Sequence, residues 1–190
     1  MNSNHDFCGS DEWREIVRDQ IIPWALGDGD LGDDVLEVGP GFGATTEVFR
    51  TRVATLTAVE IDTGLARRLA ERYAGTNVAV VEGDATALPY EADRFSGATS
   101  FSMLHHVPSP EQQDRIFAEV ARVVRPGGLF VALDSVHSPG LADAHEGDTY
   151  LPLDPDAVPE RLERNGFVDV EVRTNEYGWT ARARVGADRP

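Results

Sequence analysis

The sequence contains no lysine, and all 17 of its basic residues are arginines. This absence excludes chemistry that needs a lysine, such as the phosphate-binding lysine of a P-loop, a Schiff base, or the Tyr-x-x-x-Lys pair of short-chain dehydrogenases. Cysteine is almost as scarce, because Cys8 stands alone. An internal disulfide is therefore excluded, and a chain with one thiol fits a reducing compartment.

Long apolar runs are also missing. No stretch of about 18 apolar residues occurs, so we expect no membrane-spanning helix and no membrane partner. The N-terminal residues 1–10 are polar and carry no apolar signal region, so we expect the protein to stay in the cytoplasm. The 190 residues, 41% of them hydrophobic, suffice for one buried core but not for two ordinary domains.

Positive charge is in short supply. The 17 basic residues face 33 acidic ones, which gives a formal net charge of -16. Such a surface repels phosphate backbones and anionic lipid, so we expect no nucleic-acid partner. Cysteine and histidine also lack the spacing of zinc sites, so no metal is expected.

The order of apolar and amphipathic segments predicts an α/β fold. Strands and helices are expected in alternation at residues 35–38, 44–52, 55–59, 64–73, 77–81, 95–101, 109–125 and 129–133. Such alternation is typical of a mostly parallel sheet with helices on both faces. A helix over 155–165 and a hairpin of 167–172 with 179–185 would follow. Before the sheet, a helix capped by Ser10 should be bent or ended at Pro23.

A glycine-rich turn follows the first strand. Glycines let the backbone approach a ligand closely, and the helix after the turn presents free N–H groups. The spacing Gly39-x-Gly41-x-x-Ala44 also fits a dinucleotide site. Two residues favour a cationic ligand instead. Glu37 places a negative charge beside the turn, and Pro40 lacks the backbone donor that a pyrophosphate would use.

Two acidic residues follow the next two strands. Glu60 lies 21 residues after Gly39, where a carboxylate can accept both hydroxyl protons of a ribose diol. Asp84 lies in the turn Gly83-Asp84-Ala85 after the third strand, where it can accept a hydrogen bond from the exocyclic amine of adenine. Together with the glycine turn, these carboxylates point to one composite ligand site.

Read together, these motifs resemble those of the class I, Rossmann-like, S-adenosylmethionine-dependent methyltransferases. The resemblance rests on residues 35–43, 60, 83–89, 104–107 and 124–128. It covers roughly residues 34–134 and continues weakly through 166–167. The family implies a single doubly wound, mostly parallel sheet of seven strands with an antiparallel last strand, and S-adenosyl-L-methionine lying across the carboxyl ends of the strands. One departure is Ser96, because similar sequences usually carry aspartate before the fourth strand.

The resemblance also implies which residues bind the cofactor. Glu37 would hold the methionine amine, and Ser102 would face the methionine end. The amino-acid and sugar portions would be lined by the loop of Gly39, Pro40, Gly41 and Gly43. The adenosine would be held by Glu60 at the ribose, Ile61 on the adenine face, and Asp84 with the Ala85 backbone at the adenine edge.

The chain would divide accordingly. Residues 1–34 would form an N-terminal helical segment that packs on the cofactor site or covers it as a lid. Residues 35–190 would form the methyltransferase core. Within it, residues 35–134 would bind the cofactor, and 135–190 would supply an acceptor-side loop and the terminal hairpin.

Methyl transfer from a sulfonium needs an in-line approach, desolvation and, for a protonated nucleophile, a general base. His105 and His106 follow the fourth strand and belong to the residue type that titrates near neutral pH, so they are the candidate catalytic residues. Because adjacent side chains diverge, at most one of them should face the acceptor. A packing or capping role is the alternative for either. Asp134 is a further candidate, and His145 lies in the segment where an acceptor would dock.

The predicted function is transfer of a methyl group from S-adenosylmethionine to an oxygen, nitrogen or carbon atom of a small molecule. The motifs of DNA cytosine and amino-adenine methylases are absent near the fourth strand. Three alternatives stay open: a non-catalytic S-adenosylmethionine-binding module, a nucleotide-dependent oxidoreductase, and a ribosomal RNA adenine methyltransferase-like enzyme, which the run Val-Glu-Ile-Asp at 59–62 also resembles. Assembly as a homodimer is likewise open.

Overall fold

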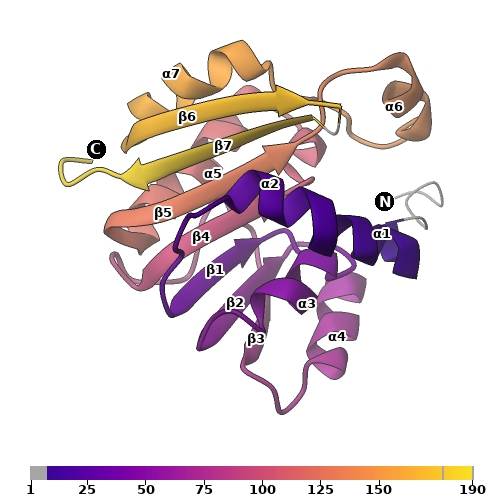
Figure 1. Cartoon of the computed structure of the whole chain (residues 1–190), viewed down its shortest axis with the longest axis horizontal. Helices are drawn as coiled ribbons and strands as arrows, with labels where there is room; N and C mark the ends of the chain where they lie inside the picture. The colour runs from indigo at the N-terminus through magenta and orange to yellow at the C-terminus, as the bar shows by residue number, and fades with distance from the viewer. Residues whose placement is uncertain (1–7, 177, 190) are drawn as a thin grey trace.

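The computed structural model describes residues 8–176 and 178–189, whose strands form one seven-stranded sheet (Figure 1). The strands are β1 (Asp34–Val38), β2 (Thr55–Glu60), β3 (Val78–Glu82), β4 (Phe95–Phe101), β5 (Val124–Asp134), β6 (Phe167–Asn175) and β7 (Gly178–Val185). They lie in the order β3-β2-β1-β4-β5-β7-β6. Strands β1 to β5 pair in parallel, and β7 runs antiparallel to both β5 and β6. The α/β sheet implied by the resemblance is confirmed.

Helices cover both faces of this sheet (Figure 1). They are α1 (Asp11–Ile16), the π-helical η2 (Val17–Ile21), α2 (Ile22–Leu26), α3 (Ala44–Phe49), α4 (Thr63–Arg72), the 3-10 turn η3 (Leu104–His106), α5 (Pro110–Val123), α6 (Pro139–Ala144), the 3-10 turn η4 (Pro155–Ala157) and α7 (Val158–Arg164). No helix in the described part of the chain has the length and apolarity needed to cross a membrane.

Two apolar cores, one on each face, hold the helices to the sheet. Because successive residues of a strand point to opposite faces, β5 contributes to both. Phe130 belongs to the core that contains Phe117 of α5, and Val131 belongs to the core that contains Ile22 of α2 and Phe49 of α3. Burial on both faces explains why the central strands read as continuous apolar runs.

The N-terminal helix does not end at Pro23 but continues to Leu26. Proline lacks a backbone N–H, and its ring crowds the carbonyl one turn earlier. The chain widens into the π-helical segment Val17–Ile21 just before Pro23, and such a wide turn accommodates the missing hydrogen bond. Ile21 and Ile22 are thereby kept buried against the sheet.

Strand β4 forms in full although Ser96 replaces the usual aspartate. The Ser96 hydroxyl accepts a hydrogen bond from the Asp34 backbone N–H at 2.9 Å and lies 2.8 Å from the carbonyl oxygen of Leu31. It therefore joins the start of β4 to the chain that enters β1. An ion pair between Arg94 and Asp34 reinforces the same edge.

Strand β5 begins five residues earlier than the sequence predicts. Helix α5 starts after the N-cap Ser109 as expected, but it ends at Val123, and Val124 is already extended. The pairing with β4 then shifts, from Phe95 opposite Val124 to Gly97 opposite Leu129. A side chain at Gly128, within this irregular stretch, would come within 2.6 Å of a β4 carbonyl oxygen. The glycine thus permits a close approach of two strands.

Candidate functional site

A cavity of about 290 Å³ lies at the carboxyl ends of β1 to β4. Ligand sites in open α/β sheets occur at this edge, and pockets for small ligands start at about 300 Å³. Seven of the ten cofactor residues predicted from the sequence line it: Gly39, Gly41, Glu60, Ile61, Asp84, Ala85 and Ser102. The fold therefore brings together motifs that are far apart in the sequence.

The glycine turn is fastened to the second strand by Glu60. Oε2 of Glu60 accepts a hydrogen bond from the backbone N–H of Gly41 at 3.0 Å, and Oε1 accepts one from Asp62 at 3.0 Å. Gly41 has a φ of +56° and no neighbour near its missing Cβ. A side chain there would be strained and would project into open space. Glu60 is 5% exposed but still lines the cavity, so it both fixes the turn and forms part of the cavity lining.

Glu37 lies behind the turn and lines neither this cavity nor the smaller one described below. Its carboxylate accepts hydrogen bonds from the hydroxyl of Thr45 and, at 2.7 Å, from that of Thr46. Burial, together with the nearby charge of Glu60, raises the pKa of Glu37 to about 7, although both threonine hydrogen bonds act in the opposite direction. Its assignment to the methionine amine therefore requires an indirect contact.

Two other loop residues also lie outside the main cavity. Pro40 is buried and lines the smaller cavity. Gly43 has a φ of +79°, and a Cβ at this position would lie 2.7 Å from the Leu69 side chain. Its carbonyl oxygen accepts a hydrogen bond from the Tyr73 hydroxyl at 3.2 Å. Gly43 thus lets the first turn of α3 pack closely against α4.

Part of the cavity lining is apolar. Ile61 is 67% exposed although it is a large hydrophobic residue, and it lines the cavity wall. Ala85 is buried and also lines the cavity. Asp84 follows β3, and its Oδ1 accepts a hydrogen bond from the Thr86 backbone at 2.8 Å. That bond fixes the orientation of the carboxylate beside the cavity.

A second, smaller cavity adjoins the first beneath the N-terminal helices. Both cavities are lined by Gly39, Gly41, Ser102 and His106. Ser102 has a φ of +53°, a conformation that costs a residue other than glycine about 1–2 kcal/mol. Its backbone N–H donates to the Leu133 carbonyl at 2.8 Å, which holds the chain in this turn. The backbone is therefore strained where the two cavities meet.

The wall that the second cavity does not share with the first is apolar and aromatic. It includes Trp13, Val17 and Ile21 from the N-terminal helices, Phe42 from the glycine turn and Phe101 from the end of β4. Residues 1–7 of the expected N-terminal segment lie outside the described residues.

The adjacent histidines occupy different environments. His105 is 5% exposed, lines neither cavity, and hydrogen-bonds through Nδ1 to Oδ1 of Asp134. Asp134, 0% exposed at the end of β5, also accepts the backbone N–H of His105 at 3.0 Å. His106 is half-buried and lines both cavities. Only one of the two histidines therefore lies beside the cavities, although the side chains do not diverge as expected, because their ring centroids are 4.1 Å apart.

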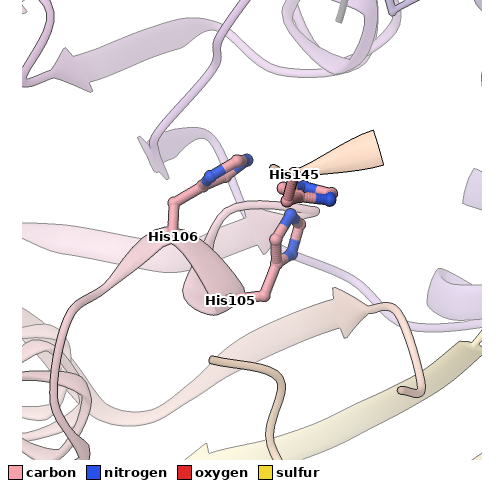
Figure 2. A group of neighbouring side chains, drawn as sticks. All are labelled: His105, His106 and His145. Carbon is pink, nitrogen blue, oxygen red and sulfur yellow. The ribbon is translucent and has the colours of Figure 1, made fainter. Parts of the chain in front are cut away.

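A third histidine completes this corner. His145 follows α6 and is 7% exposed, and its ring lies 5.0 Å from that of His105 and 5.1 Å from that of His106, centroid to centroid. Figure 2 shows the three imidazoles turned toward one another. His145 lies 39 residues after His106, so no local spacing indicates this grouping. Met103 and Gln112, which line the main cavity, were likewise not predicted from the sequence.

The chain is similar to known methyltransferases. Residues 36–132 match the family model described as a methyltransferase domain. The demethylmenaquinone methyltransferase of Thermobifida fusca is 35% identical over 111 residues, which are 57% of this chain and 46% of that protein. The ribosomal RNA small subunit methyltransferase A of Bordetella pertussis is 45% identical over 58 residues, 30% of this chain and 22% of that protein. The chain spans about half the length of the first of these relatives.

A solved structure of a Pyrococcus horikoshii protein superposes with a TM-score of 0.77 at 18% identity and covers 94% of both chains. This likeness concerns the fold alone. The family model covers just over half of the chain, from β1 to β5, and includes the glycine turn, Glu60 and Asp84. The chain therefore belongs to the class I, S-adenosylmethionine-dependent methyltransferase family.

Proposed function

We propose that this chain transfers the methyl group of S-adenosylmethionine to a small-molecule acceptor that enters the aromatic cavity beneath the N-terminal helices. The observation that carries the proposal is the junction of the two cavities at Ser102 and His106. Methyl transfer needs donor and acceptor in adjoining spaces from which water is excluded. S-adenosylmethionine, when bound, supplies a methyl group on a positively charged sulfur.

The main cavity fits the cofactor in chemistry as well as in position. Glu60 would accept the ribose hydroxyls, and its bond to Gly41 would keep the turn at the right distance. Ile61 would pack on the adenine ring, with Asp84 and the Ala85 backbone at the ring edge. These assignments are supported by the presence of all four residues in the cavity lining.

The loop residues would bind the methionine portion. Gly39, Gly41 and Ser102 line both cavities, so they would surround the part of the cofactor nearest the acceptor. Glu37 would act through Thr45 and Thr46, because its carboxyl group holds both hydroxyls in place behind the turn. Pro40 and Gly43 would shape the turn.

The aromatic wall favours an acceptor with an apolar ring. Trp13, Phe42 and Phe101 supply flat apolar surface, against which such a ring can stack or pack edge to face. The N-terminal helical segment would thus form one wall of the acceptor site. The demethylmenaquinone methyltransferase, to which this chain is similar, is named for an acceptor of this kind.

His106 is the residue proposed to contact the acceptor, because it lines both cavities. His105 is proposed as a positioning residue, since its side chain is fixed by Asp134 and lies behind His106. Movement of the reacting atoms by about 1 Å can cost about 10²-fold in rate. A fixed His105 ring that limits the movement of His106 would therefore help to maintain the rate of methyl transfer.

The test incubates the protein with methyl-labelled S-adenosylmethionine and a panel of phenols, quinols and aromatic amines. It measures both the S-adenosylhomocysteine formed and the label transferred to each acceptor. We expect label in at least one ring-containing product, at a rate that falls when Trp13 is replaced by alanine. Cofactor binding without labelled product from any acceptor would contradict the proposal and favour a non-catalytic binding module.

A ribosomal RNA substrate is the second candidate, favoured by the 45% identity over 58 residues to the Bordetella protein. The net charge of -16 opposes it, because phosphate backbones are attracted by basic surfaces. The two candidates separate in a gel-shift experiment with ribosomal RNA at physiological salt. We expect no shift at micromolar protein, and a salt-sensitive shift would favour the RNA substrate.

A further inference from the structure

Three histidines converge in one corner of the fold. His105 and His106 come from η3, after β4, and His145 comes from the end of α6 (Figure 2). One ring nitrogen from each lies within 4.8 Å of those from the other two. Nitrogen ligands of a tetrahedral Zn²⁺ lie about 2.0–2.1 Å from the metal and therefore about 3.4 Å apart. An inward movement of each ring nitrogen by about 1 Å or less would bring all three to the spacing of zinc ligands.

Hydrogen bonds to Nδ1 fix the proton position in two of these rings and leave the other nitrogen available to bind a metal ion. Nδ1 of His105 pairs with Asp134, and Nδ1 of His145 lies 2.6 Å from the carbonyl oxygen of Leu141. A carbonyl oxygen can only accept, so Nδ1 of His145 is the donor, and Asp134 favours the same arrangement at His105. The lone pair of each neutral ring is then on Nε2. Metal-binding histidines typically have this pairing of one nitrogen with a carboxylate or carbonyl.

Charge at this corner also favours a cation. Asp134 is completely buried, and its carboxylate pairs with the ring of His105. A buried carboxylate needs a compensating positive charge. A metal ion bound to the side of the His105 ring opposite Asp134 would supply it while the imidazole stays neutral. Asp148, which also lines the main cavity, adds negative charge there.

We propose that His105, His106 and His145 bind one divalent transition metal ion of the imidazole-preferring type, such as Zn²⁺. Imidazole ligands suit zinc, iron, copper and nickel, whereas Mg²⁺ and Ca²⁺ require oxygen ligands. Three protein ligands leave a fourth position open, and because His106 lines both cavities that position adjoins the acceptor space. Metal binding itself does not depend on the proposed methyl transfer.

A metal ion at this site would prevent the three histidines from acting as general bases. The lone pairs that bind the metal are the ones that a general base would use, so metal binding and histidine base catalysis exclude each other. An acceptor oxygen or nitrogen would instead be oriented toward the cofactor cavity by the ion at the wall.

The experiment uses the full chain, prepared without a polyhistidine tag and dialysed against a chelator. Co²⁺ is added while the visible absorption of tetrahedral Co²⁺ is followed, and Zn²⁺ and then Mg²⁺ are added as competitors. We expect one Co²⁺ per chain, displaced by Zn²⁺ but not by Mg²⁺. Replacing Asp134 by asparagine should weaken binding about 10–100-fold, as is usual for the hydrogen-bond partner of a ligand.

The variant His145→Ala should lose at least as much affinity for Co²⁺ as Asp134→Asn. The control His137→Ala changes an exposed histidine of the same segment and should bind Co²⁺ as tightly as the wild type. His145 does not line the cofactor cavity, so S-adenosylhomocysteine binding reports whether the variant is folded and tests the proposed function separately. If His145→Ala does not fold, His145→Gln replaces it. Absence of stoichiometric binding, or equal binding by wild type, His145→Ala and Asp134→Asn, would overturn the site.

Discussion

The backbone N–H of Gly41 donates to Oε2 of Glu60 at 3.0 Å and so ties the glycine turn after β1 to the end of β2. Two motifs 19 residues apart thereby become one structural unit. Glu60 has a double task, because the carboxylate that shapes the turn also lines the cavity. A change at Glu60 should therefore affect the whole ligand site.

Replacement of Glu60 by alanine should weaken the binding of S-adenosylmethionine and S-adenosylhomocysteine alike, by about 1–3 kcal/mol, the cost of losing a charged acceptor. The matched control is Glu82→Ala, because Glu82 pairs in register with Glu60 at the end of β3 but is exposed and bonds to Thr63. Calorimetric titration measures both. Unchanged affinity in Glu60→Ala, or an equal loss in Glu82→Ala, would contradict the assignment.

Glu37 should make stability depend on pH. Its folded pKa, about 7, lies above the unfolded value of 4.5, so the folded state keeps a proton that the unfolded chain releases. Stability from this group is complete below pH 4.5 and is lost as the pH rises toward 7. Glu37→Gln mimics the protonated form and keeps partners for both threonines.

The gain in unfolding free energy from Glu37→Gln should therefore be about 2–3 kcal/mol larger at pH 8 than at pH 5. Urea unfolding of both proteins at the two pH values measures this difference. A gain that is the same at pH 5 and pH 8 would show that Glu37 is ionised in the folded protein throughout.

His106→Ala should lower turnover of the best acceptor by about 10²-fold, because the acceptor loses a contact that sets its position. The affinity for S-adenosylhomocysteine should change far less, since Glu60 and the glycine turn stay in place. His137→Ala serves as the control, because His137 is exposed and lines neither cavity. Steady-state kinetics in which both variants match the wild type would remove His106 from the catalytic site.

Ser96→Ala should destabilise the protein by about 1–3 kcal/mol, because the Asp34 backbone N–H loses the hydroxyl that accepts from it. Ser135→Ala is the control, since its hydroxyl has only a 3.5 Å contact with Asp134 among the described residues. Its effect should stay within about 0.5 kcal/mol. The free energy of unfolding in urea distinguishes the two variants, and equal values would contradict the role of Ser96.

Sequence reasoning was sufficient for most of the sheet because its central strands are buried on both faces and read as apolar runs between turn residues. It failed at Val124, where the helix passes directly into the strand. There the pairing of Phe95 with Val124 and the bulge before Leu129 set the boundary, and tertiary pairing of this kind leaves no local signal. The continuation of the N-terminal helix past Pro23 has a similar cause, since burial of Ile21 and Ile22 stabilises the widened turn.

The residues of the candidate site also divide into those that local sequence signals indicate and those that depend on tertiary structure. Glycine spacing and carboxylates at strand ends are local signals, and the residues they indicated, Gly41, Glu60 and Asp84, all line the main cavity. Nothing local distinguishes Glu37, which lies behind the turn, from residues that line the cavity. The approach of His145 to His105 depends on how the loop after β5 folds back, which spacing along the sequence does not encode.

The most direct test of the central claim is calorimetric titration of the full chain with S-adenosylmethionine, S-adenosylhomocysteine and NAD. The family membership and the composition of the main cavity predict binding of the first two ligands, one per chain, and no binding of NAD. Binding of NAD with no response to S-adenosylmethionine or S-adenosylhomocysteine would contradict the claim and would identify the glycine turn as a dinucleotide site.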